Sequence, residues 1–187
     1  MPSSETEVVN LALTALGFEP VAALNESNDR ARVASRWYAP TRDELLRAAN
    51  WNFAQTRVDL AQVLPNPAWG TFYAYQLPAD CLMVLDTNLD ALDAWRIEGR
   101  TLITAAAAVS ILYVAQVEDP ARWDALFTEA VVDKLAFRFC YPLARSAQLA
   151  DVLYRKSEES LKRAKSRDGQ EGRHLKRFLS DVLTRGR

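Results

Sequence analysis

The sequence predicts an α+β protein: a four-helix bundle with an inserted antiparallel β region and a C-terminal amphipathic tail. Two segments before residue 50 and two after residue 119 carry apolar residues at helical spacing. Between them, much of 51–118 alternates with a period of two. Strands that are bracketed by helices are typical of α+β folds and not of doubly wound sheets. We therefore expect a bundle from 1–50 and 119–167, a β insertion at 51–118, and a linker with a docking tail at 168–187.

The first helix is predicted at 4–16. Ser4 and Glu7 fit a capping box, in which each side chain satisfies an exposed backbone N–H of the first turn. Gly17 then follows the last apolar residue, as is common after a helix end.

The second helix begins after a cap at Ser27 or Asn28. Its apolar positions extend from Ala31 to Ala49 with the period unbroken at Pro40. We therefore expect a kink at this proline and not a helix end.

The β region is predicted from alternating aromatic and β-branched residues separated by turn residues. Gly99 supplies the positive φ of a tight hairpin turn. The period changes to two at Trp51, and Trp51 and Phe53 then share a face. The expected extended segments are 51–53, 58–60, 72–77, 81–85, 95–103 (a hairpin) and 109–117.

Two further helices follow the strands. Asp119 and Pro120 fit a cap and a first helical position, which predicts a helix over 121–141 that ends at Pro142. A fourth helix is expected over 146–167, with Glu158 paired with Lys162 and Glu159 with Arg163 on its outer face. The segment 168–172 is rich in glycine and polar residues and predicts a break.

The tail at 173–187 combines an apolar stripe at helical spacing with a net charge of +4, from five basic residues against Asp181. It can be interpreted as an amphipathic helix that docks in a partner's groove, as a DNA-binding segment, or as a frayed solvated end. DNA binding would not require the apolar stripe, so we rank docking first and DNA third. The docking residues would be Leu175, Lys176, Phe178, Leu179, Val182, Leu183 and Arg185.

The stretch from Leu45 to Phe53 is predicted to join the two regions. Leu45 and Leu46 belong to the helical core, while Trp51 and Phe53 are expected to wedge the insertion against that core and fix its angle. We interpret this segment as a structural joint and not as a ligand site.

Catalytic and cofactor motifs are missing from the sequence. His174 is the one histidine, which argues against histidine-based metal sites and Ser-His-Asp or Cys-His pairs within the chain. Neither a P-loop nor a G-x-G-x-x-G pattern occurs. A carboxylate cluster for a hard cation is conceivable, but turn capping is the favoured role of its members: Asp80, Asp86, Asp90 and Asp93. We predict no enzyme, no cofactor and no metal.

Tryptophan and cysteine are both interpreted as structural. The tryptophans could be stacking platforms for a ligand, but aromatic residues at helix or strand spacing are more often core or subunit-contact residues. They are Trp37, Trp51, Trp69, Trp95 and Trp123. Cys81 and Cys140 are far apart in the sequence, which favours two small buried apolar residues over a disulfide framework or a zinc site.

Charge and hydropathy give no signal for a membrane or for nucleic acid on the whole-protein scale. The formal net charge is -1, and no apolar run approaches the roughly 20 residues that span a bilayer. The start of the chain lacks the basic and apolar regions of a signal peptide. We expect a protein made in a reducing cytoplasm, or built into an assembly that forms there.

Several segments, taken in order, resemble the tail tubular protein A family, the head-to-tail adaptors of short-tailed bacteriophages. They are NLALTALG from Asn10, LLRAANWNFA from Leu45, YQLPADC from Tyr75, WRIEGRTLI from Trp95, YV from Tyr113 and DPARWD from Asp119. The match in order and spacing covers about residues 5–171, and the tail after Gly172 matches least. Each motif is weak alone, whereas the ordered set is fairly specific.

The resemblance implies a structural virion protein without enzymatic activity, located at the head–tail junction and assembled in the bacterial host cytoplasm. Such adaptors form a ring of about twelve copies, as the symmetry of the portal requires. One face of the ring meets the portal protein, the other meets the tail nozzle protein, and double-stranded DNA passes through without sequence-specific contacts during ejection. The alternative is a DNA-binding or DNA-packaging accessory protein that acts through its basic tail.

Overall fold

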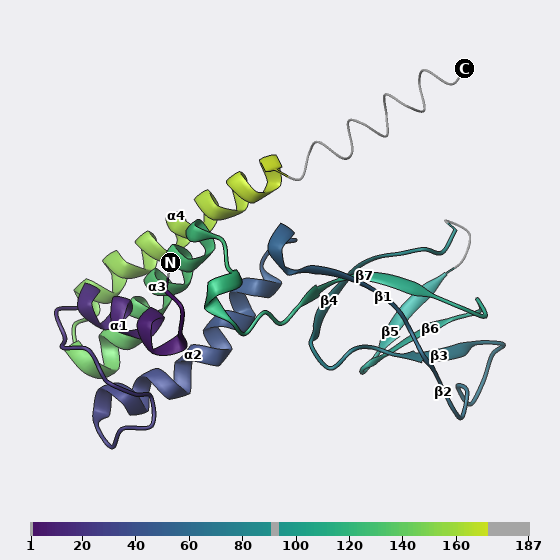
Figure 1. Ribbon diagram of the computed structural model, residues 1–187, viewed down its shortest axis with the longest axis horizontal. Helices are drawn as coiled ribbons and strands as arrows, with labels where there is room; N and C mark the ends of the chain where they lie inside the picture. Colours follow the sequence, from purple (N-terminus) through teal and green to yellow (C-terminus); the bar gives the residue numbers. More distant parts are fainter. Residues whose placement is uncertain (1, 91–93, 172–187) are drawn as a thin grey trace. The chain divides into compact units, whose positions relative to one another are not determined.

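The structure, a computed structural model, describes residues 2–90 and 94–171 (Figure 1). The chain divides into two compact units, and each has its own core. The helical unit comprises residues up to 53 together with those from 117 on, and the β unit comprises residues 54–116.

Both helices before the strands begin at the predicted caps. Helix α1 (Glu5–Ala15) starts after Ser4, whose Oγ accepts a hydrogen bond from the Glu7 N–H at 3.2 Å. Helix α2 (Asp29–Arg47) starts after Asn28, whose Oδ1 accepts from a backbone N–H of the first turn at 2.8 Å. As expected, α2 runs through Pro40 without ending there.

Helix α3 (Ala125–Phe139) begins later than predicted. Asp119 and Pro120 start a short 3₁₀ turn, Pro120–Arg122, and not the α-helix itself. A second aspartate, Asp124, then caps α3 by accepting from the backbone N–H of Leu126 at 2.8 Å. The local cap signal was therefore real, but it belongs to a separate turn that precedes the helix.

Helix α4 (Ala147–Glu171) follows a π-helical turn, Cys140–Ala144, that contains Pro142. The prediction that the helix breaks at Asp168 is wrong, because α4 continues through Gly169 to Glu171, the last described residue. A single glycine costs a helix only about 1 kcal/mol, and the packing of α4 on α3 offsets this.

The prediction of a four-helix bundle with an inserted β region is wrong. In such a bundle each helix packs on two neighbours around one shared core. Here α3 packs against α1, α2 and α4, while α4 makes extensive contact with α3 and the turn before it but not with α1 or α2 (Figure 1). The structure remains α+β, with helices grouped around α3 and strands in two sheets.

The strand predicted at 51–53 is also wrong. Asn52–Ala54 forms a 3₁₀ turn, and the first strand begins one residue later at Gln55. Trp51 and Phe53 alternate because both rings pack on the helix residue Phe127.

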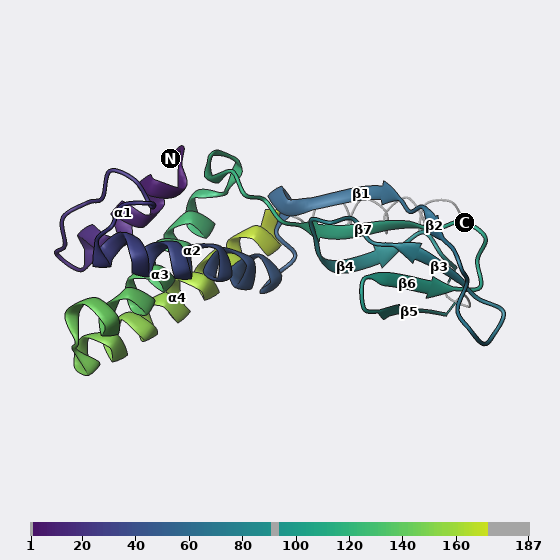
Figure 2. The ribbon, with the colours of Figure 1, turned by 90° about the horizontal axis from the view of Figure 1, so that it is seen from below.

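All strand pairs in the described part of the β unit are antiparallel, and they form two sheets (Figure 2). The three-stranded sheet has the order β1-β7-β4 and the four-stranded sheet the order β2-β3-β6-β5. The strands are β1 (Gln55–Asp59), β2 (Gln62–Val63), β3 (Tyr73–Gln76), β4 (Cys81–Thr87), β5 (Trp95–Glu98), β6 (Thr101–Thr104) and β7 (Ser110–Ala115).

The two sheets contribute to one buried cluster. Tyr75 from β3 and Leu102 from β6 meet Ile111 and Tyr113 from β7 in it. The predicted hairpin is confirmed as β5 and β6, with Gly99 at φ +60° in the connecting turn. Both cysteines of the chain lie in the described part as buried thiols, Cys81 within this cluster and Cys140 in the helical unit.

Candidate functional site

The predicted docking residues of the tail lie outside the described residues. This holds for Leu175, Lys176, Phe178, Leu179, Val182, Leu183 and Arg185. Their role in portal docking stays a prediction, and a candidate site must be sought within 2–90 and 94–171.

Trp51 and Phe53 lie in the core of the helical unit. Trp51 is fully buried, and its Nε1 donates a hydrogen bond to the Leu45 carbonyl at 2.8 Å. Its ring centre lies 4.9 Å from that of Phe127, and the Phe53 ring centre lies 5.0 Å from the same ring. Trp123 contacts Phe127 edge-on at 5.3 Å. The segment after α2 is thus anchored on Phe127 of α3 by two aromatic rings, and Trp123 packs on the same residue.

A polar hollow of about 360 Å³ lies beside Phe53 in the helical unit. The backbone N–H of Asn52 donates to Asp168 Oδ1 at 2.9 Å, and its side-chain amide donates to the Asp168 carbonyl at 2.8 Å. Arg167 pairs with Glu171 at 3.4 Å. Charges of both signs thus line the hollow, and this arrangement selects no class of ligand. The lining residues are Asn52, Phe53, Arg122, Trp123, Asp124, Arg167, Asp168 and Glu171.

Asp168 should make stability depend on pH. Partial burial raises the pKa of this carboxyl above its ordinary value, against the lowering effect of the Asn52 N–H. The folded state therefore binds the proton more tightly than the unfolded state, so its contribution is most favourable below the ordinary aspartate pKa of about 3.9. That contribution is lost as pH rises through the raised value.

We expect Asp168→Asn to be more stable than the wild type at neutral pH, because the amide keeps the acceptor for Asn52 without a charge to desolvate. The difference should shrink to nothing below about pH 4, where Asp168 itself is protonated. Urea unfolding at several pH values measures this. Asp151→Asn, at an exposed position of the same helix, is the control. An equal difference at all pH values would contradict the assignment.

Two of the aspartates considered as a cation site accept hydrogen bonds from neighbouring groups of the chain. Asp80 accepts a hydrogen bond from the Tyr113 hydroxyl at 3.2 Å, and Asp86 accepts from the Thr87 N–H at 2.9 Å. Burial, with Asp80 nearby, raises the pKa of Tyr113 to about 12. Asp93 lies outside the described residues. No group of three or more potential metal ligands occurs within the residues that the structure describes.

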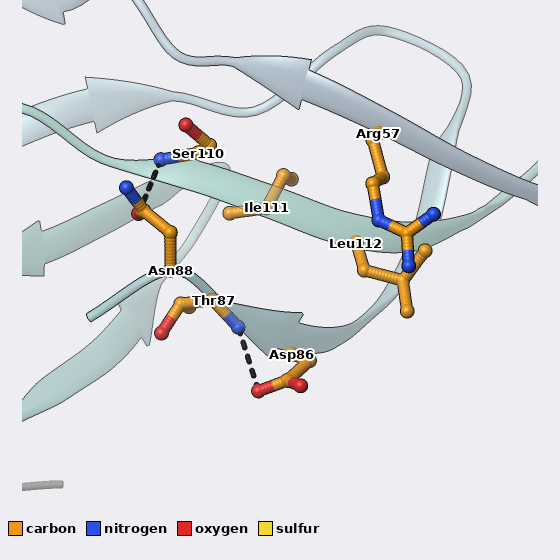
Figure 3. A pocket seen from close by; sticks show the side chains of 7 residues that line it. All are labelled: Arg57, Asp86, Thr87, Asn88, Ser110, Ile111 and Leu112. Atoms are coloured by element: carbon orange, nitrogen blue, oxygen red, sulfur yellow. Dashed lines mark hydrogen bonds between the residues drawn. The ribbon is translucent and has the colours of Figure 1, made fainter. Parts of the chain in front are cut away.

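A second hollow lies where β4 and β7 meet in the β unit (Figure 3). Its volume is about 170 Å³, which is below the roughly 300 Å³ at which ligand pockets begin. Its polar groups are used internally, because Asn88 Oδ1 accepts from the Ser110 N–H at 2.8 Å and Ser110 Oγ donates to Asp59 at 2.5 Å. Arg57 lies across the hollow from these groups. We interpret it as a structural corner of the sheet.

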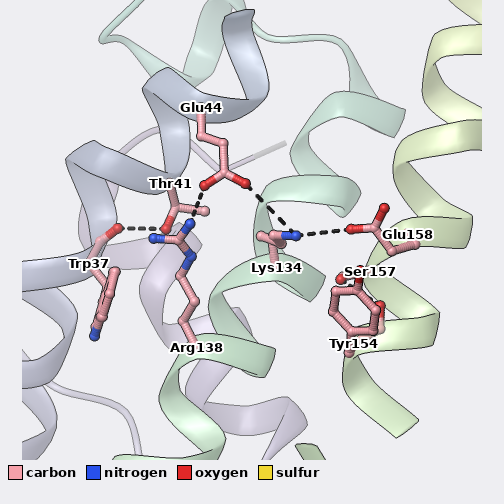
Figure 4. Close-up of polar contacts among 8 residues, drawn as sticks. All are labelled: Trp37, Thr41, Glu44, Lys134, Arg138, Tyr154, Ser157 and Glu158. Atoms are coloured by element: carbon pink, nitrogen blue, oxygen red, sulfur yellow. Dashed lines mark hydrogen bonds and ion pairs between the residues drawn. The ribbon is translucent and has the colours of Figure 1, made fainter. Parts of the chain in front are cut away.

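A polar network joins three helices around Lys134 (Figure 4). Lys134 Nζ lies 3.0 Å from a Glu158 carboxylate oxygen on α4 and 3.9 Å from one of Glu44 on α2. Arg138 also binds Glu44, and its guanidinium lies 4.6 Å from the ring centre of Trp37. Each cation has a carboxylate partner, so this network holds α2 and α4 to α3.

The described surface of the β unit carries exposed apolar side chains near its four-stranded sheet. Trp69 is 73% exposed and Leu64 76% exposed. Trp95 and Ile97 on β5 are also exposed, and every residue of that strand is exposed. Exposed apolar patches on a protein surface can mark sites of contact with other proteins. The exposed apolar side chains of the β unit are therefore a candidate binding surface.

Sequence reasoning found Trp69 and Trp95 but missed Leu64 and Ile97. It treated all five tryptophans alike, as core or contact residues, whereas Trp51 and Trp123 are buried and Trp69 and Trp95 are not. A signal was present for Ile97, because it lies between Arg96 and Glu98 in a hairpin strand next to a tight turn. Leu64 had no comparable signal.

Among the described helices, none combines the length and apolar character needed to cross a membrane. Comparison with known proteins found no family model that matches the chain and no curated protein that matches it.

Proposed function

We propose that the chain is a structural virion protein, a head-to-tail adaptor between the portal and the tail nozzle of a short-tailed bacteriophage. In this role about twelve copies surround the channel through which DNA leaves the head. The protein acts by contact and not by catalysis.

The structural observation that supports this proposal most is the exposed apolar surface of the β unit. An adaptor needs surfaces for its neighbours and for two further proteins, and buried interfaces are enriched in aromatic and aliphatic side chains. Trp69 and Leu64 remain largely exposed in the single chain. The ordered segments that resemble tail tubular protein A add support from the sequence.

The test is to mix the full-length protein with the portal protein encoded in the same genome. We expect a second ring bound to the portal ring in electron micrographs. A protein that stays unattached at every ratio would contradict the proposal. A free monomer alone would not, since the portal itself can template ring formation.

Variants of the tail separate docking from DNA binding. If the tail docks through its apolar stripe, Leu175→Ala/Leu179→Ala should weaken portal attachment, since interface anchors can each cost more than about 1 kcal/mol. Lys176→Ala/Arg185→Ala should leave attachment nearly unchanged. The DNA-binding alternative predicts the reverse ranking in a mobility-shift assay, with affinity that falls steeply as salt rises.

A further inference from the structure

We propose that β5 is a self-association edge, through which two copies of this chain pair antiparallel about a two-fold axis at Ile97. This contact is independent of the proposed function. The same surface is used by both copies, so the contact joins two free subunits. Neighbours in a cyclic ring instead meet through two different surfaces.

Within residues 2–90 and 94–171, β5 has a strand partner on one side alone and forms an edge of the four-stranded sheet (Figure 2). It pairs with β6 on one side, and all four of its residues are exposed. An edge strand presents a row of backbone N–H and C=O groups that a further strand can bind. Trp95 and Ile97 add exposed apolar surface to this row.

Backbone N–H and C=O groups alternate in direction along a strand, and this alternation determines which residues of β5 turn these groups to the open edge. The Gln76 N–H donates to the Ala61 carbonyl at 3.0 Å, so Gln76 on β3 faces β2 and not β6. Because backbone groups alternate in direction along a strand, Arg96 and Glu98 must face β6. The N–H and C=O of Ile97 therefore point to the open edge, as do those of Trp95.

An antiparallel pair centred on Ile97 satisfies this alternation. Ile97 of each copy then faces Ile97 of the other, and the two residues can exchange both of their backbone hydrogen bonds. In this register Arg96 of each copy lies directly opposite Glu98 of the other. Opposite charges placed across from each other stabilise a strand pair, whereas like charges destabilise it.

The two registers centred on the neighbours of Ile97 bring like charges together. Centring the pair on Arg96 places two arginines opposite each other, and centring it on Glu98 does the same with two glutamates. Charges at an edge usually discourage pairing, but here opposite signs two residues apart select one register. Within one copy, Arg96 Nε donates to Glu98 at 2.5 Å, so both groups already lie on one face.

The charge-matched register of a head-to-tail contact between β5 and β1 is excluded by the alternation of the backbone groups. Charge matching would place Arg96 opposite Asp59 and Ile97 opposite Val58. However, the Leu60 N–H donates to the Val109 carbonyl of the β7 side at 2.9 Å, so alternation turns the backbone groups of Val58 toward β7. They cannot meet the outward groups of Ile97, and self-pairing is the matching arrangement.

Sedimentation equilibrium of the full-length protein, from about 1 µM to about 1 mM, tests the proposal over the range of weak association. We expect a monomer–dimer equilibrium in the wild type. Ile97→Pro should abolish the dimer, because proline removes the outward N–H and yet is tolerated at an edge strand. Circular dichroism spectra and melting temperatures establish that each variant is folded.

Charge variants provide a second, independent arm. Arg96→Glu and Glu98→Arg should each weaken the dimer about tenfold or more, because each turns two favourable pairs into two like-charged ones. Combining Arg96→Glu with Glu98→Arg should restore it. Arg57→Glu, on the edge strand of the other sheet, is the matched control and should have no effect.

Several outcomes would overturn the proposal. These are a wild type that stays monomeric throughout, a dimer that survives Ile97→Pro, and rescue of Arg96→Glu by Asp59→Arg in place of Glu98→Arg. If Ile97→Pro does not fold, the charge variants decide alone, since Glu98 is an exposed residue.

Discussion

Replacing Phe127 by alanine is expected to lower the free energy of unfolding of the helical unit by about 3–5 kcal/mol. The Phe127 ring is fully buried and contacts the rings of Trp51, Phe53 and Trp123. The substitution leaves a cavity between α3 and the segment after α2, and it removes edge-on aromatic contacts of about 0.5–1.5 kcal/mol each.

Chemical denaturation followed by tryptophan fluorescence measures this loss, because two of the affected rings are tryptophans. Phe137→Ala is the matched control on the same helix. Phe137 is only half-buried and has Tyr154 as its ring partner at 5.4 Å, so its truncation should cost clearly less. Equal losses in the two variants would show that the aromatic cluster around Phe127 stabilises the fold no more than the single ring contact of Phe137.

Asp133→Ala is the second substitution with a large expected effect, about 1.5–3 kcal/mol, the range for a hydrogen bond to a charged group. The Asp133 side chain on α3 is 4% exposed. It accepts a hydrogen bond from Ser160 Oγ at 2.6 Å and lies 2.9 Å from Lys156 Nζ, and both partners are on α4. The loss should appear as weaker docking of α4.

Glu129→Ala is the control for Asp133→Ala. Glu129 also reaches from α3 to α4, where it pairs with Arg163 at 2.7 Å, but its side chain is 46% exposed. Exposed ion pairs contribute about 0–1 kcal/mol. Thermal and urea unfolding measure the stability loss of both variants, and the isosteric Asp133→Asn serves as an intermediate case. A larger loss for Asp133→Ala than for Glu129→Ala would show that burial makes the contact stronger. If Glu129→Ala were as damaging as Asp133→Ala, burial would not be the cause.

The parts of the fold that the sequence predicted correctly depend on local interactions. Ser4 and Asn28 cap their helices through bonds to residues three positions away, and Gly99 forms the hairpin turn by its own backbone freedom. The end of α4 was mispredicted because packing on α3 outweighs the local cost of Gly169.

Long-range contacts explain why the bundle and the first strand were mispredicted. Helical periodicity shows that a helix has an apolar face but does not name the helix that covers it. Glu158 was expected to pair with Lys162 along α4, yet it pairs with Lys134 on α3. The spacing of Trp51 and Phe53 likewise mimics a strand, although Phe127 is the cause of it.

The candidate site was harder to predict than the fold. Apolar spacing is the same in a buried strand as in an exposed edge strand, so periodicity alone does not separate Ile97 from a core residue, and only its charged neighbours Arg96 and Glu98 indicate exposure. The backbone groups of Ile97 point to the open edge because of the hydrogen-bond pattern across the whole sheet, which is seen at Gln76, two strands away. No pattern in the sequence near Ile97 shows this direction.

Helix α4 has fewer neighbours in the helical unit than α3, so less free energy is needed to detach it. Helix α3 is held by three helices, whereas α4 is held by α3, by the turn before it and by two hydrogen bonds from Asn52. Detaching α4 breaks its interface with α3, including the bonds to Asp133 and Lys134, and the two hydrogen bonds from Asn52, while the ring contacts of Phe127 do not involve α4. Partial opening of this kind requires less free energy than global unfolding. We therefore expect the helix from Ala147 to Glu171 to open locally before the rest of the helical unit unfolds.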